Sequence, residues 1–208
     1  GLKLSCPDKK VLVFTGDGDC LAIGGNHMLH ACKRNIDIAV VMINNHIYAM
    51  TGGQKSPATP SGISTKTSPW GSYDEPMEGA ELAISMGATY VARWTTAHPV
   101  QLEKSIRAGI EHKGFSFIEV ISQCPVQSGK EVYGDKDPSF IINYLKENSY
   151  VYKEGMEEPK GKIKCGILKH DNDRPEYIER MQRQLEQRRE VKTAKEKKGA
   201  QGKNDRER

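Results

Sequence analysis

The stretch from residue 11 to residue 54 constrains the fold of this chain more than any other. Two apolar, β-branched runs, Val11–Phe14 and Ile36–Ile43, flank a segment with helical periodicity at residues 21–34. The expected N-cap of this helix is Asp19, and its expected buried face is Leu21, Ile23, Met28, Leu29 and Cys32. Short buried strands on either side of a helix are typical of a βαβ unit in a parallel sheet. We therefore expect an α/β fold in which a parallel sheet carries helices on both faces.

Each of these two strands ends in a polar cluster. Residues 16–19 (Gly-Asp-Gly-Asp) follow the first strand, and Asn44-Asn45 follows the second. Open α/β sheets bind ligands at the carboxyl ends of their strands, so both clusters should face one crevice. A Gly-rich turn at the start of a helix usually holds phosphate, but two aspartates would repel a bare diphosphate. A Mg²⁺ ion between carboxylate and phosphate removes that conflict.

The candidate Mg²⁺ ligands are the carboxylate of Asp17, the side-chain oxygen of Asn45 and a backbone carbonyl such as that of Ile47. Other phosphate motifs fit less well. The dinucleotide fingerprint requires a third glycine at position 21, which is Leu21, and no P-loop sequence occurs. Gly18 and Asn44 are separated by 25 residues. The combination of GDG and NN at that spacing is more specific than GDGD alone.

This spacing resembles the thiamine diphosphate motif. The continuation at residues 50–60, MTGGQKSPATP, is similar to a segment of the β subunits of 2-oxoacid:ferredoxin oxidoreductases, most closely the 2-oxoglutarate type. The resemblance runs from about residue 1 to about residue 177 and implies the thiamine diphosphate-binding fold. Some broad-specificity relatives have Lys where this chain has Gly52, so substrate recognition cannot be carried over at that position.

The resemblance also implies roles for individual residues. They fall into a metal set and a cofactor set. The implied Mg²⁺ ligands are Asp17, Asn45 and the carbonyl of Ile47, and the implied cofactor-binding residues are Gly16, Asp17, Gly18, Asp19, Asn45, Ile47, Met50 and Thr51. The implied reaction is oxidative decarboxylation of a 2-oxo acid to acyl-CoA and CO₂, with electrons passed to ferredoxin. An α subunit would supply the pyrimidine-binding domain, and no residue here is assigned as a general base.

The cysteines carry a further implication of the resemblance. Cys124 matches the fourth ligand of the family's [4Fe-4S] cluster, whose other ligands lie in a segment before residue 1, so we expect this chain to be a fragment. Local sequence alone favours an ordinary buried thiol for a single cysteine before proline, whereas the resemblance favours the cluster ligand. The five cysteines are odd in number, irregularly spaced and without a C-x-x-C pair, which argues against a disulfide framework and for a reducing cytoplasm: Cys6, Cys20, Cys32, Cys124 and Cys165.

The rest of the chain continues the α/β pattern. We expect a diphosphate-binding domain at residues 1–150, an arm at 151–175 with a strand near 162–168, and a charged helix with a partly disordered tail at 176–208. Helices are expected at 79–86, 99–113 and 138–148, and strands at 89–93 and 115–121. The long Gly/Ser/Thr/Pro-rich connection at 47–70 is interpreted as a wall or lid of the site.

Two histidine features remain open at this level. His27 and His30 are spaced for one helix face, which fits a metal pair or, as we favour, ordinary packing. His46 is left without a role, because strand alternation would turn it away from Asn45. No apolar run approaches the roughly 18 residues that a membrane span requires.

Two other functions compete with the favoured one. A non-oxidative thiamine diphosphate decarboxylase or synthase would share GDG and NN but would not use Cys124 or the residue 50–60 segment. A nucleic-acid-binding module could act through residues 188–208, which hold nine Lys or Arg against four Asp or Glu. We favour a solvated or subunit-packing tail, because it lacks aromatic residues for base stacking.

Overall fold

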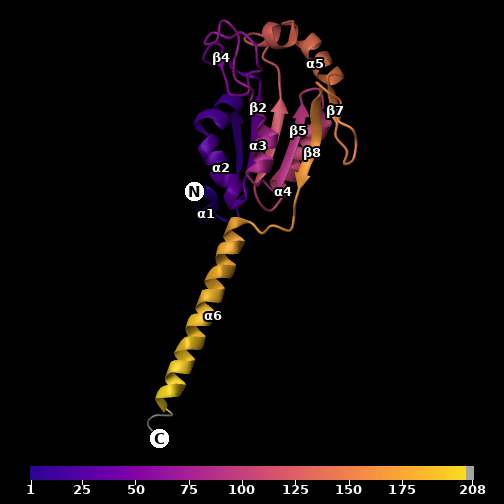
Figure 1. The fold of residues 1–208 in the computed structure, drawn as a ribbon. Coiled ribbons are helices and arrows are strands. Elements are labelled where there is room, and N and C mark those ends of the chain that lie inside the picture. The colour runs from indigo at the N-terminus through magenta and orange to yellow at the C-terminus, as the bar shows by residue number, and fades with distance from the viewer. Residues whose placement is uncertain (205–208) are drawn as a thin grey trace.

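A six-stranded sheet forms the centre of the molecule, in the order β1-β2-β6-β5-β8-β7 (Figure 1). The computed structural model describes the backbone of residues 1–204 and the side chains as far as residue 193. The strands of this sheet are β1 (Leu12–Gly16), β2 (Ala39–Asn44), β5 (Tyr90–Thr95), β6 (Ser116–Ile121), β7 (Ser149–Val151) and β8 (Ile163–His170). β1, β2, β6 and β5 are parallel neighbours, whereas β8 is antiparallel to β5. The predicted parallel sheet is therefore confirmed, with the two strands β8 and β7 added at one edge in the opposite direction.

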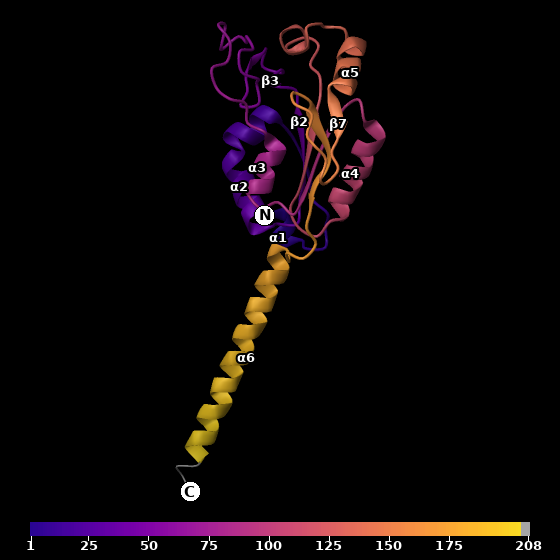
Figure 2. The same cartoon turned by 45° about the vertical axis from the view of Figure 1, so that its right-hand side comes forward.

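Helices cover both faces of this sheet, as predicted. Figure 2 shows α2 and α3 on one face and α4 on the other. The helices are α1 (Leu2–Ser5), α2 (Gly25–Arg34), α3 (Gly79–Ser85), α4 (Pro99–Glu111), α5 (Pro138–Glu147) and α6 (Tyr177–Asn204), with single-turn π-helices η1 (Asp19–Ile23) and η2 (Gly129–Tyr133). A short hairpin of β3 (Ile47–Tyr48) and β4 (Gln54–Lys55) lies above the carboxyl ends of the strands.

The central strands are buried on both faces, which is why their sequences are mostly apolar. Side chains of β2 alternate between two clusters. Val40 and Met42 pack with α2 and α3, whereas Val41 packs with β5, β6 and α4 on the opposite face. β1 lies at the edge of the sheet instead, and Phe14 on it is 65% exposed. The sheet therefore has one buried centre and one open edge next to the GDGD turn.

The first crossover helix differs from its prediction. Asp19 does not cap it: Gly18 holds that position, and Asp19 lies in the first turn of η1. The π-helical turn and the break at Gly24 shift the helical phase, so that Ile23 is 82% exposed and Leu29 is 38% exposed although both were expected inside. Leu21, Met28 and Cys32 are buried as expected.

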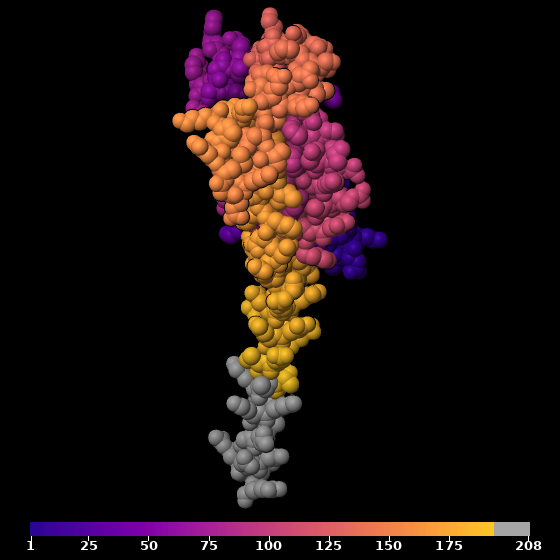
Figure 3. Space-filling view, turned by 90° about the vertical axis from the view of Figure 1, so that its right-hand side faces the viewer, coloured from indigo at the N-terminus to yellow at the C-terminus, as the bar shows by residue number. Residues whose placement is uncertain are grey.

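The C-terminal third joins the sheet and then leaves it. β8, near the strand predicted at residues 162–168, pairs with β5 from Tyr90 to Arg93. α6 then projects from the amino edge of the sheet, away from the body (Figure 3). None of the helices in the described part of the chain is long and apolar enough to cross a bilayer. The end of the predicted basic tail, residues 205–208, lies outside the described residues.

Candidate functional site

Asp17 and Asn45 lie together at the carboxyl edge of the sheet. β1 and β2 are paired in parallel register, with Gly16 opposite Ile43, so the residues that follow each strand are neighbours. Asp17 is only 2% exposed. The backbone N–H of Asn45 is among the groups that favour the ionised form of the Asp17 carboxylate. The side-chain oxygen of Asn45 accepts a hydrogen bond from the N–H of Ile47 at 3.3 Å. The residues predicted to share a metal are therefore adjacent.

The Asp17 carboxylate is buried and forms no ion pair among the described residues. Burial raises its pKa above the ordinary value, and a hydrogen bond from Ser56, the nearby charge of His46 and backbone N–H groups only partly offset that effect. A buried carboxylate is costly unless it is paired or coordinates a metal. A carboxylate and an amide oxygen are donors of the kind that suits Mg²⁺ completed by phosphate oxygens, and the carbonyl of Ile47 remains the predicted third donor.

The GDG turn requires glycine because an aromatic ring lies against it. The hydroxyl of Tyr48 donates to the carbonyl oxygen of Gly18 at 2.8 Å. A Cβ atom at Gly18 would lie 2.3 Å from the nearest carbon of that ring. Tyr48 thus fixes the turn next to Asp17. The predicted phosphate-loop residue Asp19 is exposed and accepts a hydrogen bond from Thr15 at 2.8 Å, while Gly16 ends β1.

The loop after β4 forms a wall of this site. The hydroxyl of Ser56 donates to Oδ2 of Asp17 at 2.5 Å, and Thr59 donates to the carbonyl of His46 at 2.7 Å. Ser56 and Thr59 are each 2% exposed. His46 adopts a left-handed conformation, with φ of 65°, and its Nδ1 lies 3.0 Å from the Ala58 carbonyl. The prediction that strand alternation turns His46 away from Asn45 does not apply, because β2 ends at Asn44 and His46 lies outside it.

A buried hydrogen-bonded network of charged side chains holds Asn44, the residue before the candidate ligand Asn45. Asn44 donates to Oε1 of Glu119 at 2.9 Å, and Nε of Arg93 donates to Oε2 of the same carboxylate at 2.7 Å. Burial opposes ionisation of Glu119, but Arg93 and Asn44 outweigh it and hold its pKa below the ordinary value. Sequence reasoning missed this network, although a Glu and an Arg inside apolar strands were a visible signal.

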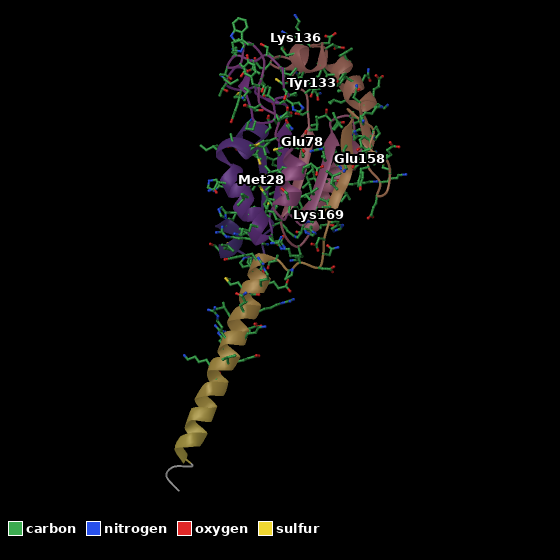
Figure 4. The ribbon with its side chains drawn as sticks, in the orientation of Figure 1. Met28, Glu78, Tyr133, Lys136, Glu158 and Lys169 are labelled. Atoms are coloured by element: carbon green, nitrogen blue, oxygen red, sulfur yellow. The ribbon has the colours of Figure 1, made fainter. Side chains whose placement is uncertain are left out.

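A groove of about 630 Å³ opens beside the network. Its walls come from residues 58–60, 76–81 and 158–164, with Asn44 and His46 on its lining. Glu78 and Glu158, which line it on opposite sides, are labelled in Figure 4. The groove therefore leads from the surface to the residues next to the candidate metal ligands.

The turn between β3 and β4 is the most exposed part of the predicted site. Met50 is 98% exposed, and Thr51 is also on the surface. Gly52 and Gly53 have positive φ values of 114° and 102°, which favour glycine. Nothing in the described part of this chain covers Met50, so this turn can meet a partner or a ligand.

Cys124 follows β6 at the same edge and is half-buried. The described residues contain no group of three or more His, Cys, Asp or Glu side chains that could hold a metal ion, so no four-thiolate site is formed around Cys124. His27 and His30 likewise have no third ligand of these types within the described residues. Burial raises the pKa of both the Cys20 and Cys32 thiols to about 12, as expected of structural cysteines.

Comparison with known proteins leads to the class that the sequence motifs resemble, the thiamine diphosphate-binding enzymes. The family model for the thiamine pyrophosphate enzyme, C-terminal TPP binding domain, matches residues 1–120. The chain therefore belongs to the thiamine pyrophosphate-binding enzymes, and its relatives place it among the 2-oxoacid:ferredoxin oxidoreductase subunits.

The particular relatives are 2-oxoglutarate synthase subunits. The KorB subunit of Methanocaldococcus jannaschii is 52% identical over 190 residues, covering 89% of this chain and 70% of that protein. KorB of Methanothermobacter marburgensis is 46% identical, covering 90% and 66%. A 2-oxoglutarate:ferredoxin oxidoreductase from Magnetococcus marinus, solved with 2-oxoglutarate, coenzyme A and succinyl-CoA bound, matches with a TM-score of 0.78 and 27% identity, covering 90% of this chain and 65% of that one. This chain thus spans about two thirds of these relatives.

Proposed function

We propose that this chain is the thiamine diphosphate- and Mg²⁺-binding subunit of a 2-oxoglutarate:ferredoxin oxidoreductase. The observation that carries the proposal is the buried carboxylate of Asp17, which has no ion pair among the described residues and lies beside Asn45 at the carboxyl ends of the strands. Relatives named 2-oxoglutarate synthase support the choice of oxo acid. The enzyme would convert the 2-oxo acid to acyl-CoA and CO₂, with ferredoxin as electron acceptor.

The residues of this chain would bind and orient the cofactor. Asp17, Asn45 and the Ile47 carbonyl would hold Mg²⁺, and backbone N–H groups of the turn at Gly18 would face the diphosphate. When bound, thiamine diphosphate supplies the carbanion chemistry that decarboxylates a 2-oxo acid. Met50 and Thr51 would border the cofactor and substrate. We assign no residue of this chain as the general base.

A second subunit would complete the site. Four large side chains near this edge are exposed: Met50 (98%), Trp70 (87%), Tyr73 (86%) and Val126 (73%). Exposed apolar side chains in such numbers are typical of an interaction surface. This supports a pyrimidine-binding α subunit that closes over the carboxyl edge. Cys124 would supply one thiolate of a [4Fe-4S] cluster, and the proposal requires the other ligands to come from polypeptide beyond this sequence.

The test is anaerobic reconstitution with the α subunit. We expect reduction of ferredoxin that requires 2-oxoglutarate, CoA, thiamine diphosphate and Mg²⁺ together, and its loss in Asp17→Ala. Paramagnetic resonance of the reduced complex should show a cluster signal that disappears in Cys124→Ser. Release of CO₂ that is independent of an electron acceptor would instead identify a non-oxidative decarboxylase. Retained activity in Asp17→Ala would contradict the metal assignment.

A further inference from the structure

A buried chain of hydrogen bonds joins the end of α4 to the start of α6. Nε2 of His112 lies 2.8 Å from Oγ1 of Thr89, which in turn lies 2.8 Å from Oδ1 of Asn35. Nδ2 of Asn35 donates to the carbonyls of Arg174 and Pro175, both at 3.2 Å. Asn35 and Thr89 are fully buried, and His112 is 6% exposed. Three polar side chains inside the protein therefore hold the segment that precedes α6.

The directions of these hydrogen bonds fix which nitrogen of His112 carries the ring proton. The Thr89 hydroxyl has one proton, and its two acceptors are oxygens that cannot donate: Oδ1 of Asn35 at 2.8 Å and the Phe115 carbonyl at 3.4 Å. Oδ1 of Asn35 also accepts from the N–H of Phe115, at 2.8 Å. Thr89 can therefore only accept from His112, so the proton is on Nε2. Nδ1 is buried and has no hydrogen-bond partner within the described part of the chain, and a second proton would bind there.

The surroundings of His112 disfavour a second proton on its ring. The ring of Tyr90 lies 5.7 Å away, and the ring of His170 lies 5.5 Å away. Burial, followed by the charge of His170, lowers the pKa of His112 below its ordinary value. Three groups oppose this shift without outweighing it: Asp37, Asn172 and Asp171. Because Asp37 is already paired with Lys3 at 2.7 Å, the neutral ring is the form that suits this interior.

Residues 170–177 lie against this histidine and lead from β8 into α6 (Figure 1). The N–H of Asp171 donates to the Thr89 carbonyl at 2.8 Å. The N–H of Tyr177 donates to the Asn35 carbonyl at 3.0 Å. Lys169, directly before the segment, is labelled in Figure 4 near the end of the sheet from which α6 leaves. The segment is thus attached to the same two residues that connect it to His112.

We propose that residues 170–177 form an acid-sensitive latch, which lifts and frees the start of α6 when Nδ1 of His112 binds a second proton. A buried charge without a partner is costly, and lifting the latch admits water that solvates the charge. The ordinary pKa of histidine is about 6.5, and the closed latch lowers that of His112, so the open state binds the proton more tightly. The closed state is therefore fully favoured above the ordinary pKa and loses stability as pH falls below it.

Amide hydrogen exchange of the full chain between about pH 8 and pH 5, the range in which histidine titrates, tests the latch. After correction for the intrinsic exchange rate, the protection of the Asp171 and Tyr177 N–H groups should fall by about 10-fold or more. An unpaired buried group costs at least that much in an equilibrium constant. At pH 5 the latch should exchange at least about 10-fold faster than β6, whose amides open only on global unfolding.

His112→Gln places an amide donor near the position of Nε2 and cannot take up a proton, so it should abolish the pH dependence of the latch. His98→Asn is the matched control, because His98 is the half-buried histidine at the other end of α4, beside Thr95. It should keep the behaviour of the wild-type chain.

Latch protection that is equal at both ends of the pH range would overturn the proposal, as would a wild-type pH dependence in His112→Gln. Equal exchange of the latch and β6 at pH 5 would also overturn it, by showing that acid unfolds the whole domain. If His112→Gln does not fold, the nuclear magnetic resonance titration of His112 in the wild-type chain decides. Its ring must take up a proton over the pH range in which the latch opens, and a ring that stays neutral there would contradict the latch.

Discussion

At the scale of single residues, the Asp17 carboxylate lowers the stability of the metal-free chain but is suited to binding a cation. Asp17 is buried, its pKa is raised by that burial, and the described residues offer it no ion pair. Because protonation is favoured in the folded chain, the metal-free protein loses stability as pH rises through the pKa of Asp17. A bound cation would stabilise the ionised carboxylate, so binding of Mg²⁺ and the cofactor should raise the stability of the folded chain.

Asp17→Asn should therefore stabilise the metal-free chain at pH 7 by about 1 to 3 kcal/mol, the usual cost of an uncompensated buried polar group. The amide oxygen can still accept from Ser56, while the charge is removed. Thermal unfolding without Mg²⁺ measures the change, and binding of thiamine diphosphate with Mg²⁺ should be lost. Asp74→Asn is the control, since Asp74 is 73% exposed. A less stable Asp17→Asn chain would show that the folded state already compensates this charge.

Ser56 is the residue that orients this carboxylate. Its hydroxyl donates to Oδ2 of Asp17 at 2.5 Å and so fixes the orientation of the carboxylate. Outer contacts of this kind typically contribute 10- to 100-fold to metal affinity. We expect Ser56→Ala to weaken Mg²⁺ binding by about 10-fold, measured by calorimetry with thiamine diphosphate in the assembled complex. Ser61→Ala, on the same loop but exposed, should have no effect. Equal affinity in both variants would exclude an orienting role for Ser56.

At the scale of secondary structure, three neighbouring strands are joined by one buried carboxylate. Asn44 on β2, Glu119 on β6 and Arg93 on β5 form a continuous row beneath the site. The N–H of Ala80 at the start of α3 also donates to Glu119, at 3.1 Å. A change at Glu119 should therefore reach the NN pair and the helix together.

Glu119→Gln tests this row. Breaking one partner of a buried ion pair usually destabilises a protein by about 3 to 5 kcal/mol, and the remaining Glu78 contact of Arg93 places the expected loss at about 3 kcal/mol. Chemical denaturation measures it. Glu103→Gln is the matched control, since its pair with Arg107 is exposed and should contribute less than about 1 kcal/mol. Equal stability of the two variants would show that the Glu119 pair adds nothing to the fold.

The elements that sequence predicted well are those defined by local chemistry. The helix at α4 begins with Pro99, α5 is capped by Asp137, and β6 is a buried strand that is apolar except for Ser116 and Glu119. Asp17 and Asn45 could be predicted to lie together because parallel neighbours end at the same edge. Ser56 could not be placed, because it reaches Asp17 only through tertiary closure of a long loop. The π-helical turn η1, which moves Ile23 and Leu29 off the buried face, also depends on tertiary packing, and the periodicity of apolar residues in the sequence does not predict it.

At the scale of the whole molecule, the candidate site and α6 lie at opposite edges of the sheet (Figure 1). The chain is anchored before α6 by Arg174, whose guanidinium donates to the carbonyls of Gly87 and Lys33 at 2.5 and 2.6 Å. Asn35 donates to the Arg174 carbonyl at 3.2 Å. The start of the helix is therefore part of the folded body, and its later turns extend away from that body.

Removing residues 183–208 should therefore leave the domain folded. Within α6, Ile178 is 7% exposed and packs on the body, whereas Met181, Leu185 and Val191 are 42%, 47% and 55% exposed. Most helical stability in proteins comes from tertiary packing, which this segment lacks in the single chain. We expect the truncated chain to lose helical circular dichroism but to keep its thermal midpoint and its affinity for thiamine diphosphate, because the site lies at the far edge.

Ile178→Ala in the full chain provides the contrast, since deleting a buried aliphatic side chain costs about 2 kcal/mol or more. A midpoint that falls as far in the truncated chain as in Ile178→Ala would mean that α6 packs against the body in solution. An unchanged thermal midpoint and cofactor affinity in the truncated chain would separate the role of the strand ends from that of α6. Cofactor binding would depend on the strand ends, and α6 would present its basic surface to a partner without affecting that site.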